Sequence, residues 1–249
     1  MQIKCSTMNK LTYLCFIAVI LGAQSGLAGK APFISPCKTG DNPCILAAAQ
    51  SAVPIMAVGI PELGIKSLDP MQFDEIKGDQ GGLSLNFKDT TVTGMKGCNV
   101  DAVKHDLTKG KQSITIRCTV KLVGDYKLDG NILVLPIRGE GKYHIDIRDI
   151  VIKASTALVT KDGDDGKKHW HIDNWHYTSQ VKTGAKFNFD NLFNGNKLLA
   201  GPVEDFVNTN WREVMHEIAP PIVRAIVART VEAVEALYKA VPAEELYIP

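Results

Sequence analysis

The strongest constraint on the fold of this 249-residue chain is the apolar pattern of its last sixty residues. Between Val203 and Leu237 apolar residues recur at steps of three and four, which predicts one very long helix with a single apolar stripe. At about 1.5 Å per residue such a helix would run roughly 50 Å. Pro220 and Pro221 should bend it without reversing it, because the stripe continues in phase on both sides. A helix of this length needs a partner that extends along it.

The partner that the sequence offers is a β-sheet. Residues 71–190 are rich in β-branched residues, short alternations and turn signals. In 113–122 every second residue is apolar, so these residues would share one face of a strand. Turns are predicted at 129–130, 139–141 and 162–163. We therefore expect an elongated α+β protein, in which a highly curved antiparallel sheet wraps the long C-terminal helix.

A shorter helix is predicted to begin near Asn42, which can cap it, with Pro43 in the first helical position. No charged residue lies between Cys44 and Ile60, so this helix is apolar nearly all round and should be buried or face an oily partner. Pro54 should kink the helix or end it early.

The chain begins with a pattern that is typical of a secretory signal peptide, residues 1–28. Lys4 and Lys10 make a basic start, and residues 11–22 form an apolar run that small residues follow. A signal anchor is the competing interpretation, but this run has twelve residues whereas roughly 20 span a bilayer. We expect a secreted, extracellular protein with one domain, residues 29–249.

Charge and cysteine content restrict the function further. Loss of the segment with its two lysines takes the formal net charge from +1 to −1, which gives no electrostatic reason to expect nucleic acid as a partner. Four cysteines remain, and they allow three disulfide pairings. Cys37 and Cys44 flank a turn sequence that favours a bridge between them, and Cys98 would then pair with Cys118 by elimination.

The stretch HWHIDNWH, residues 169–176, holds three of the six histidines. On a strand His169, His171 and Asp173 would share a face, at a spacing that can chelate zinc. Trp170, however, is the better residue to face an apolar interior. We therefore predict that the histidines lie on the outer, solvated face of a surface strand, with a metal site as the alternative.

Other motifs that would indicate catalysis are absent from the sequence. It contains no Gly-x-Ser-x-Gly elbow, and His216 has no second histidine four positions away. His105 and Asp106 fall in a polar stretch and are expected to form a solvated turn. We predict no catalytic residue, no metal site, no cofactor and no enzymatic activity.

Four stretches resemble one known family. They are CKTGDNPCILAAAQSAVPIMAVGIPELGIKSLDPM from Cys37, YKLDGNILVLPIRGEGKYHIDI from Tyr126, FNFDNLFNGNKLLAGPVEDFVNTNWREV from Phe187 and VPAEELYIP from Val241. In this order and at this spacing they resemble the insect takeout family, relatives of the juvenile-hormone-binding proteins. The resemblance spans essentially the whole chain after the signal peptide.

The resemblance implies a tubular lipid-binding fold with an apolar tunnel between the sheet and the long helix. Family members are soluble carriers of small hydrophobic ligands such as terpenoid hormones, fatty acids or quinone-like molecules. The family's N-terminal disulfide falls on Cys37 and Cys44. Cys98 and Cys118 stand outside that signature, and they are either bridged or buried free thiols.

We therefore expect a monomeric carrier of one small hydrophobic ligand, without stable membrane insertion. The alternative is a membrane-surface lipid-binding or transfer protein of the same fold group, which would need a basic tip to dock on anionic lipid. Apolar inner faces of a helix and a sheet either close into solid core or leave a lined cavity. The residues expected to line the tunnel are Ile45, Ala49, Val53 and Met56 from the first helix, Leu85, Phe87, Ile116, Val120, Leu133 and Trp170 from the sheet, and Phe206, Trp211, Val214, Met215, Ile218 and Ile222 from the last helix.

Overall fold

The structure is a computed structural model that describes residues 31–248, so the expected signal peptide lies outside the described residues. The helices are α2 (Asn42–Val58), α3 (Lys197–Thr209), α4 (Trp211–Ala240) and α5 (Ala243–Leu246), with short 3-10 helices η1 (Pro61–Leu63), η2 (Met95–Gly97), η3 (Leu107–Lys109) and η4 (Phe193–Gly195). The strands are β1 (Cys37–Lys38), β2 (Met71–Gln80), β3 (Leu83–Thr93), β4 (Asn99–Asp106), β5 (Lys111–Ile132), β6 (Leu135–Asp162), β7 (Lys168–Phe189) and β8 (Tyr247–Ile248).

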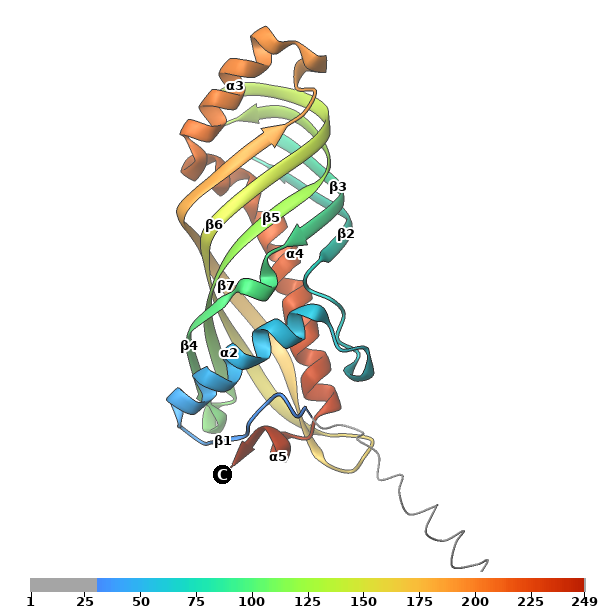
Figure 1. The fold of residues 1–249 in the computed structure, drawn as a ribbon, viewed down its shortest axis with the longest axis vertical. Coiled ribbons are helices and arrows are strands. Elements are labelled where there is room, and N and C mark those ends of the chain that lie inside the picture. Colours follow the sequence, from blue (N-terminus) through green and yellow to red (C-terminus); the bar gives the residue numbers. More distant parts are fainter. Residues whose placement is uncertain (1–30, 249) are drawn as a thin grey trace, which may run out of the picture. The chain divides into compact units, whose positions relative to one another are not determined.

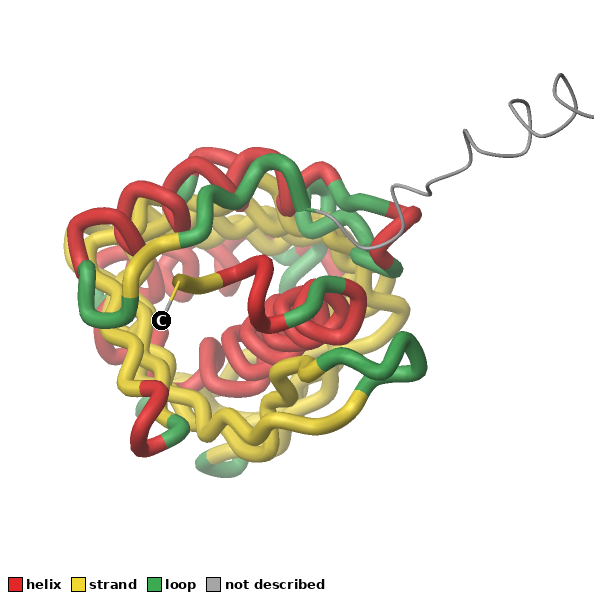
Figure 2. The backbone as a smooth tube through the Cα atoms, turned by 90° about the horizontal axis from the view of Figure 1, so that it is seen from below, coloured by secondary structure: helices red, strands yellow, loops and turns green. Residues whose placement is uncertain are grey.

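Six of these strands form one antiparallel sheet. Its order is β2-β3-β5-β6-β7, and β4 pairs with β5 beside β3. β5, β6 and β7 are 22, 28 and 22 residues long, and register shifts interrupt the pairing of β5 with β6 and of β6 with β7. Such bulges bend long strands and increase their twist, and Figures 1 and 2 show a strongly curved sheet. The predicted α+β class, with a curved antiparallel sheet and a long C-terminal helix, is confirmed.

α4 lies between the two edges of the sheet. It packs against β7 at one edge and β2 at the other, and the strands curve around it when the backbone is viewed from one end (Figure 2). Gly78 of β2 allows this approach, since a Cβ atom at Gly78 would lie 2.8 Å from Cγ of Pro221. The apolar stripe of α4 and the inner face of the sheet therefore share one core.

The prediction of one unbroken helix from Val203 to Leu237 is wrong. The chain forms α3 and α4, which are interrupted at Asn210, where the side-chain amide donates a 2.8 Å hydrogen bond to the carbonyl oxygen of Phe206. Asparagine side chains compete with the helix for backbone hydrogen bonds in this way. Pro220 and Pro221 lie inside α4, which continues through them because its neighbouring turns are packed between two strands.

Two of the three predicted turns are also wrong. Residues 129–130 lie within β5 and residues 139–141 lie within β6, whereas a turn does follow at 163–167, directly after Asp162 ends β6. The glycines in β6 serve close packing: a Cβ atom at Gly141 would lie 2.6 Å from the carbonyl oxygen of Asp190. The segment that follows β7 lies against these glycines, and a Cβ atom at Gly139 would lie 3.0 Å from Cα of Leu192.

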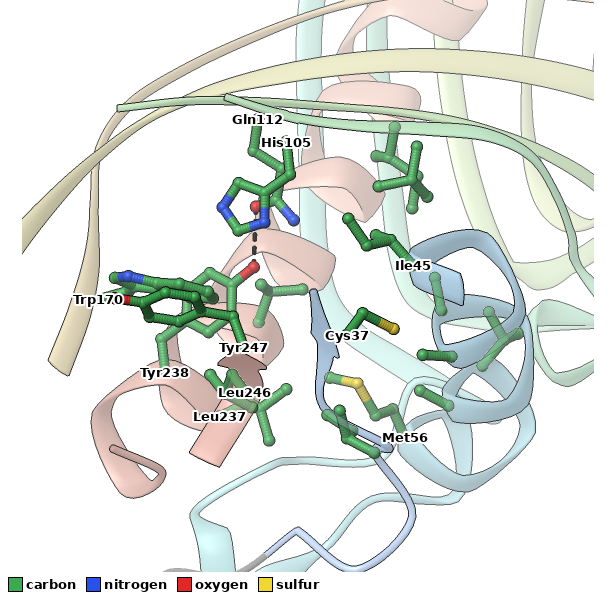
Figure 3. A pocket seen from close by; sticks show the side chains of 18 of the residues that line it. Cys37, Ile45, Met56, His105, Gln112, Trp170, Leu237, Tyr238, Leu246 and Tyr247 are labelled. Carbon is green, nitrogen blue, oxygen red and sulfur yellow. Dashed lines mark hydrogen bonds between the residues drawn. The ribbon is translucent and has the colours of Figure 1, made fainter. Parts of the chain in front are cut away.

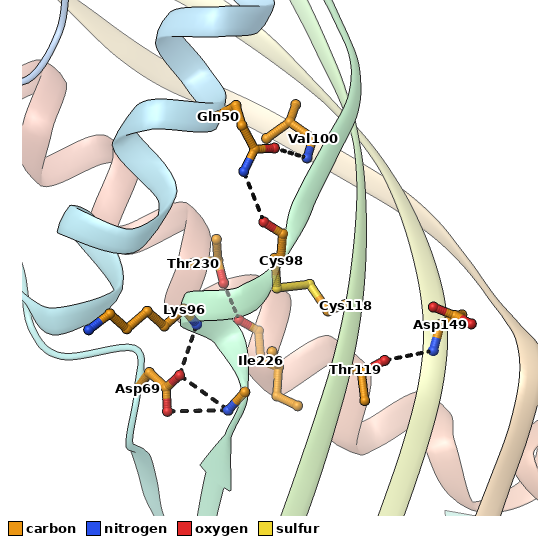
Figure 4. Close-up of a disulfide and its surroundings, with 11 residues drawn as sticks. Gln50, Asp69, Lys96, Cys98, Val100, Cys118, Thr119, Asp149, Ile226 and Thr230 are labelled. Carbon is orange, nitrogen blue, oxygen red and sulfur yellow. Dashed lines mark hydrogen bonds between the residues drawn. A yellow bond between two sulfur atoms is a disulfide. The ribbon is translucent and has the colours of Figure 1, made fainter.

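Both cysteine pairs are bridged. Cys37 is bonded to Cys44, and Cys98 to Cys118, so the alternative of buried free thiols at the second pair is wrong (Figure 4). Beside the second bridge, the side chain of Gln50 in α2 accepts a 2.6 Å hydrogen bond from the backbone N–H of Val100. It also donates a 3.3 Å hydrogen bond to the carbonyl oxygen of Cys98. These bonds hold α2 across the start of β4.

We expect Gly141→Ala to lower the free energy of unfolding by about 1–3 kcal/mol, because the new methyl group meets backbone atoms that cannot move aside easily. Urea denaturation would measure the change. Gly201→Ala in α3 is the matched control: its Cβ meets nothing within 4 Å, and alanine should stabilise the helix by up to about 1 kcal/mol. Equal stability of the two variants would contradict the proposed contact.

Candidate ligand-binding cavities

Two apolar cavities adjoin inside the fold. The first has a volume of about 240 Å³ and lies between α2, β4, β5 and the C-terminal end of the chain (Figure 3). The second, of about 180 Å³, lies between β5, β6, β7 and the middle of α4. The two share part of their walls and are therefore neighbours. The residues that line both are Met95, Gln112, Ile114, Ile116, Thr230 and Val234.

One wall of the first cavity is a face of α2. The helix is capped by Asp41, whose side chain accepts a 3.1 Å hydrogen bond from the backbone N–H of Cys44, so the cap is one residue earlier than predicted. The helix also continues through Pro54 to Val58 instead of ending early. One face of this uncharged helix lines the cavity, as its composition predicted. Ile55 and Val58, in contrast, are exposed.

The opposite wall comes from the C-terminal end of the chain. β8 pairs in parallel with β1, so that Tyr247 lies beside Cys37 and Ile248 beside Lys38. The pairing folds the last described residues back over the end of α4. It places Leu246 and Tyr247 on the cavity, opposite α2 (Figure 3).

Trp170 is the centre of an aromatic cluster on this wall. Its ring stacks on Tyr247 at 5.5 Å between centroids and meets Tyr238 edge-on at 5.4 Å. His105 packs against it edge-on from β4 at 4.8 Å. The tryptophan is buried and lines the cavity, as expected for an inward-facing residue.

The histidine-rich strand has a structural role that its pattern did not predict. His169 is only 5% exposed, and its Nδ1 donates a 3.1 Å hydrogen bond to the carbonyl oxygen of Tyr238. Its Nε2 lies 3.1 Å from a carboxylate oxygen of Asp165. His171 pairs with Glu235 of α4. The prediction of a solvated outer face is therefore wrong for His169, whereas the His171 side chain is 34% exposed and contacts α4 at the sheet edge.

The same strand carries a bulge. The pairing of β6 with β7 shifts register between Ala157 and Leu158, which leaves Asp173 without a partner residue. Beyond it His176 is exposed, as predicted. Within residues 31–248 no three His, Cys, Asp or Glu side chains are grouped so that they could hold a metal ion.

The second cavity is lined by alternating residues of β5 and by the apolar stripe of α4. Ile114, Ile116, Cys118, Val120 and Leu122 all face it, which agrees with the shared face that the alternation predicted. The helix contributes residues from Met215 to Val234. The inward-facing residues of the strand, which recur every second position, and the apolar stripe of the helix, with its period of 3.6, therefore line the same cavity.

The structure brings ten of the sixteen predicted lining residues to these cavities. Those on the first cavity are Ile45, Ala49, Val53, Met56 and Trp170; those on the second are Val120, Met215, Ile218 and Ile222; Ile116 is on both. The remaining six, which line neither cavity, are Leu85, Phe87, Leu133, Phe206, Trp211 and Val214.

Three of these six residues lie elsewhere for clear reasons. Phe87 is buried in β3 and packs edge-on against Tyr143, 4.8 Å away, so β3 forms solid core. Leu133 is at the tip of the β5–β6 hairpin, where its backbone N–H donates a 2.9 Å hydrogen bond to Glu217. Trp211, beside the break at Asn210, stacks under the guanidinium group of the following arginine. Helical periodicity cannot separate the part of a stripe that lines a cavity from the part that packs against solid core.

The polar residues of the cavity wall were not identified from the sequence. The hydroxyl group of Tyr238 donates a 2.8 Å hydrogen bond to the side-chain oxygen of Gln112. Burial raises the pKa of Tyr238 to about 12. His105 was expected in a solvated turn, but it is half-buried in β4, and burial lowers its pKa. No local pattern indicates these residues, because their surroundings come from other strands and from α4.

We expect Glu235→Leu to lower the free energy of unfolding by about 1–3 kcal/mol. The carboxylate accepts a 2.8 Å hydrogen bond from the backbone N–H of Ile172 as well as pairing with His171, and both groups would lose their partner. Glu232→Leu, on the exposed side of the same helix, should change stability by less than about 0.5 kcal/mol. Similar losses in the two variants would show that the contact to β7 does not hold α4.

Alkaline pH should destabilise the protein through its buried tyrosines. Burial raises the pKa of Tyr126, Tyr143 and Tyr238 to about 12. An unfolded tyrosine titrates near pH 10, so the folded state holds these protons more tightly. Their contribution to stability is complete below about pH 10 and is lost as the pH rises through about 12. Urea unfolding across this range should show the fall, and Tyr238→Phe should make it shallower. An unchanged slope in that variant would contradict the assignment.

No helix within residues 31–248 is long and apolar enough to span a membrane.

Comparisons with known proteins agree with this architecture. Residues 14–248 match the family described as haemolymph juvenile hormone binding protein (JHBP). The crystal structure of Takeout 1 from Epiphyas postvittana superimposes with a TM-score of 0.84 and 29% identity, and covers 87% of this chain and 100% of that one.

Two curated relatives extend the likeness in sequence. The circadian clock-controlled protein daywake of Drosophila melanogaster is 25% identical over 94% of this chain and 96% of its own length. The juvenile hormone-binding protein of Manduca sexta is 24% identical over 59% of this chain and 64% of its own. The fold and the family match both support the predicted resemblance, and the chain belongs to the haemolymph juvenile hormone binding protein family.

Proposed function

We propose that this protein is a secreted carrier that holds one small hydrophobic ligand in a tunnel between α2, α4 and the sheet. The observation that carries this proposal is the pair of adjoining apolar cavities, which share six lining residues. Rotation of a few such side chains, among them Ile116 and Val234, would join the two spaces. The membership in a family of hydrophobic-ligand-binding proteins supports it.

The chemistry of the lining favours binding by burial of surface. Isoleucine, valine, leucine, alanine and methionine make up most of both linings, and such a lining selects for shape and hydrophobicity. Burial of about 300 Å² of alkyl or isoprenoid surface would contribute about 7–8 kcal/mol before the cost of immobilising the ligand. This burial alone corresponds at most to micromolar affinity, and it requires no catalytic group.

We further propose that the protein acts outside the cell, as a monomer and without enzymatic activity. Its two disulfides support an oxidising location. Among the described residues, those around the cavities supply packing and a few hydrogen bonds, and none forms a nucleophile–base pair.

The direct test is native mass spectrometry of the secreted protein, followed by organic extraction and identification of the released molecule. One co-purifying hydrophobic molecule at near one-to-one stoichiometry is the expected result. A protein that is empty and also fails to take up a fluorescent fatty acid or terpenoid probe would overturn the carrier function. Co-sedimentation with anionic vesicles would instead favour transfer at a membrane surface.

We expect Ala49→Trp to weaken binding of N-phenylnaphthylamine at least about 10-fold, because the indole would occupy the first cavity. Ala47→Trp is the matched control, since this alanine is on the exposed side of the same helix. Its affinity should equal that of the unchanged protein. Fluorescence titration measures both, and equal affinities for the two variants would place the bound probe outside the first cavity.

A further inference from the structure

Three polar side chains form a row across the sheet where the cavities meet. His105 of β4 is the direct partner of Gln112 in β5, and Gln112 is the direct partner of Thr156 in β6. Directly opposed residues of neighbouring strands project to the same face of a sheet, about 5 Å apart. Gln112 lines both apolar cavities, while His105 lines the first and Thr156 the second. The row therefore marks the junction between them.

This row contains unused hydrogen-bonding capacity. Within residues 31–248, three buried side-chain nitrogen or oxygen atoms have no hydrogen-bond partner, and two of them are Nε2 of His105 and Oγ1 of Thr156. The other polar groups nearby are occupied: Tyr238 donates to Gln112 (Figure 3), and the hydroxyl group of Thr230 donates to the carbonyl oxygen of Ile226 at 2.9 Å. Buried polar groups are normally paired, so two unpaired groups in one row at a cavity indicate a missing partner.

The row also lies at a boundary between polar and apolar space. A third cavity of about 690 Å³ has the row in its wall, together with Lys104, Lys111 and other exposed polar residues. It therefore opens to solvent. A molecule whose polar end reaches the row would place its apolar chain in the two inner cavities.

We propose that His105, Gln112 and Thr156 form a polar subsite that hydrogen-bonds an uncharged oxygen group, such as an ester, a ketone or an alcohol, at one end of an apolar ligand. The subsite rests on the proposed carrier function and adds to it the chemistry of the ligand's end. Hydroxyl, amide and imidazole groups offer both donors and acceptors, which suits such an oxygen.

An uncharged group fits the row better than a carboxylate. Burial favours the neutral form of His105, and Tyr238, which faces the row from α4, is neutral as well. The charged groups of the third cavity are Lys104 and Asp106 on the strand of His105, and Lys111 beside Gln112, and both lysines are exposed. A carboxylate at the row would lose its hydration without gaining a buried counter-charge.

The test compares three ligands of matched chain: dodecane, methyl laurate and lauric acid. Each competes with N-phenylnaphthylamine for the purified, delipidated protein at neutral pH. Methyl laurate should bind about 10-fold more tightly than dodecane, and lauric acid no more tightly than methyl laurate. Thr156→Val, which keeps the shape of the side chain, should reduce the preference for methyl laurate over dodecane about 3–10-fold. His105→Leu should act in the same direction.

Thr160→Val is the matched control, because Thr160 is exposed on the same strand and should not affect the preference. Thr156→Val should not lower the melting temperature of the empty protein, since it removes an unpaired buried group. If dodecane and methyl laurate bind equally, or if both variants keep the preference, the subsite is wrong and the carrier function stands. Tighter binding of lauric acid would overturn the uncharged class. If no ligand displaces the probe, the carrier function fails and the subsite with it.

Discussion

The rest of the structure depends on the contact of α4 with both edges of the sheet. A sheet of long strands has two edges whose backbone groups lack partners, and a long amphipathic helix has a stripe that must be buried. α4 packs against both sheet edges and buries its own apolar stripe in the same contact. It approaches β2 at Gly78, and on the β7 side Glu235 accepts a hydrogen bond from the backbone of Ile172. This packing offsets the backbone hydrogen bonds that Pro220 and Pro221 remove from the helix.

Space for a ligand follows from the same contact. The strands bend at their bulges and stand away from α4 in its middle and C-terminal parts, and the side chains there do not fill the gap. Protein interiors are normally packed as densely as organic crystals, so cavities of 240 and 180 Å³ have a cost that a bound ligand would offset. The N-terminal disulfide loop and β8 cover one end of this space. At the other end, Phe87 and Tyr143 fill the interior.

The histidine-rich strand illustrates how a conspicuous motif acquires its role from its neighbours. In sequence, His169, His171 and Asp173 have the spacing of metal ligands. In the fold, the two histidines bind different parts of α4, and the aspartate lies at a bulge. They position the helix that carries Tyr238, and Trp170 between them forms the cavity wall. The residues with the greater chemical interest, His105 and Thr156, lie in unremarkable stretches.

The sequence by itself determined the α+β class, the alternating inner face of β5, the stripe of α4 and ten of the residues that line the cavities. These features follow from periods of 2 and 3.6, which are local properties of strands and helices. The tertiary structure alone decided the break at Asn210, the continuation of β6 through its glycines, whether Cys98 and Cys118 are bridged, and the row from His105 to Thr156. Each of these depends on which segments are neighbours and in what register they pair, because a hydrogen bond or a close contact needs both partners in place.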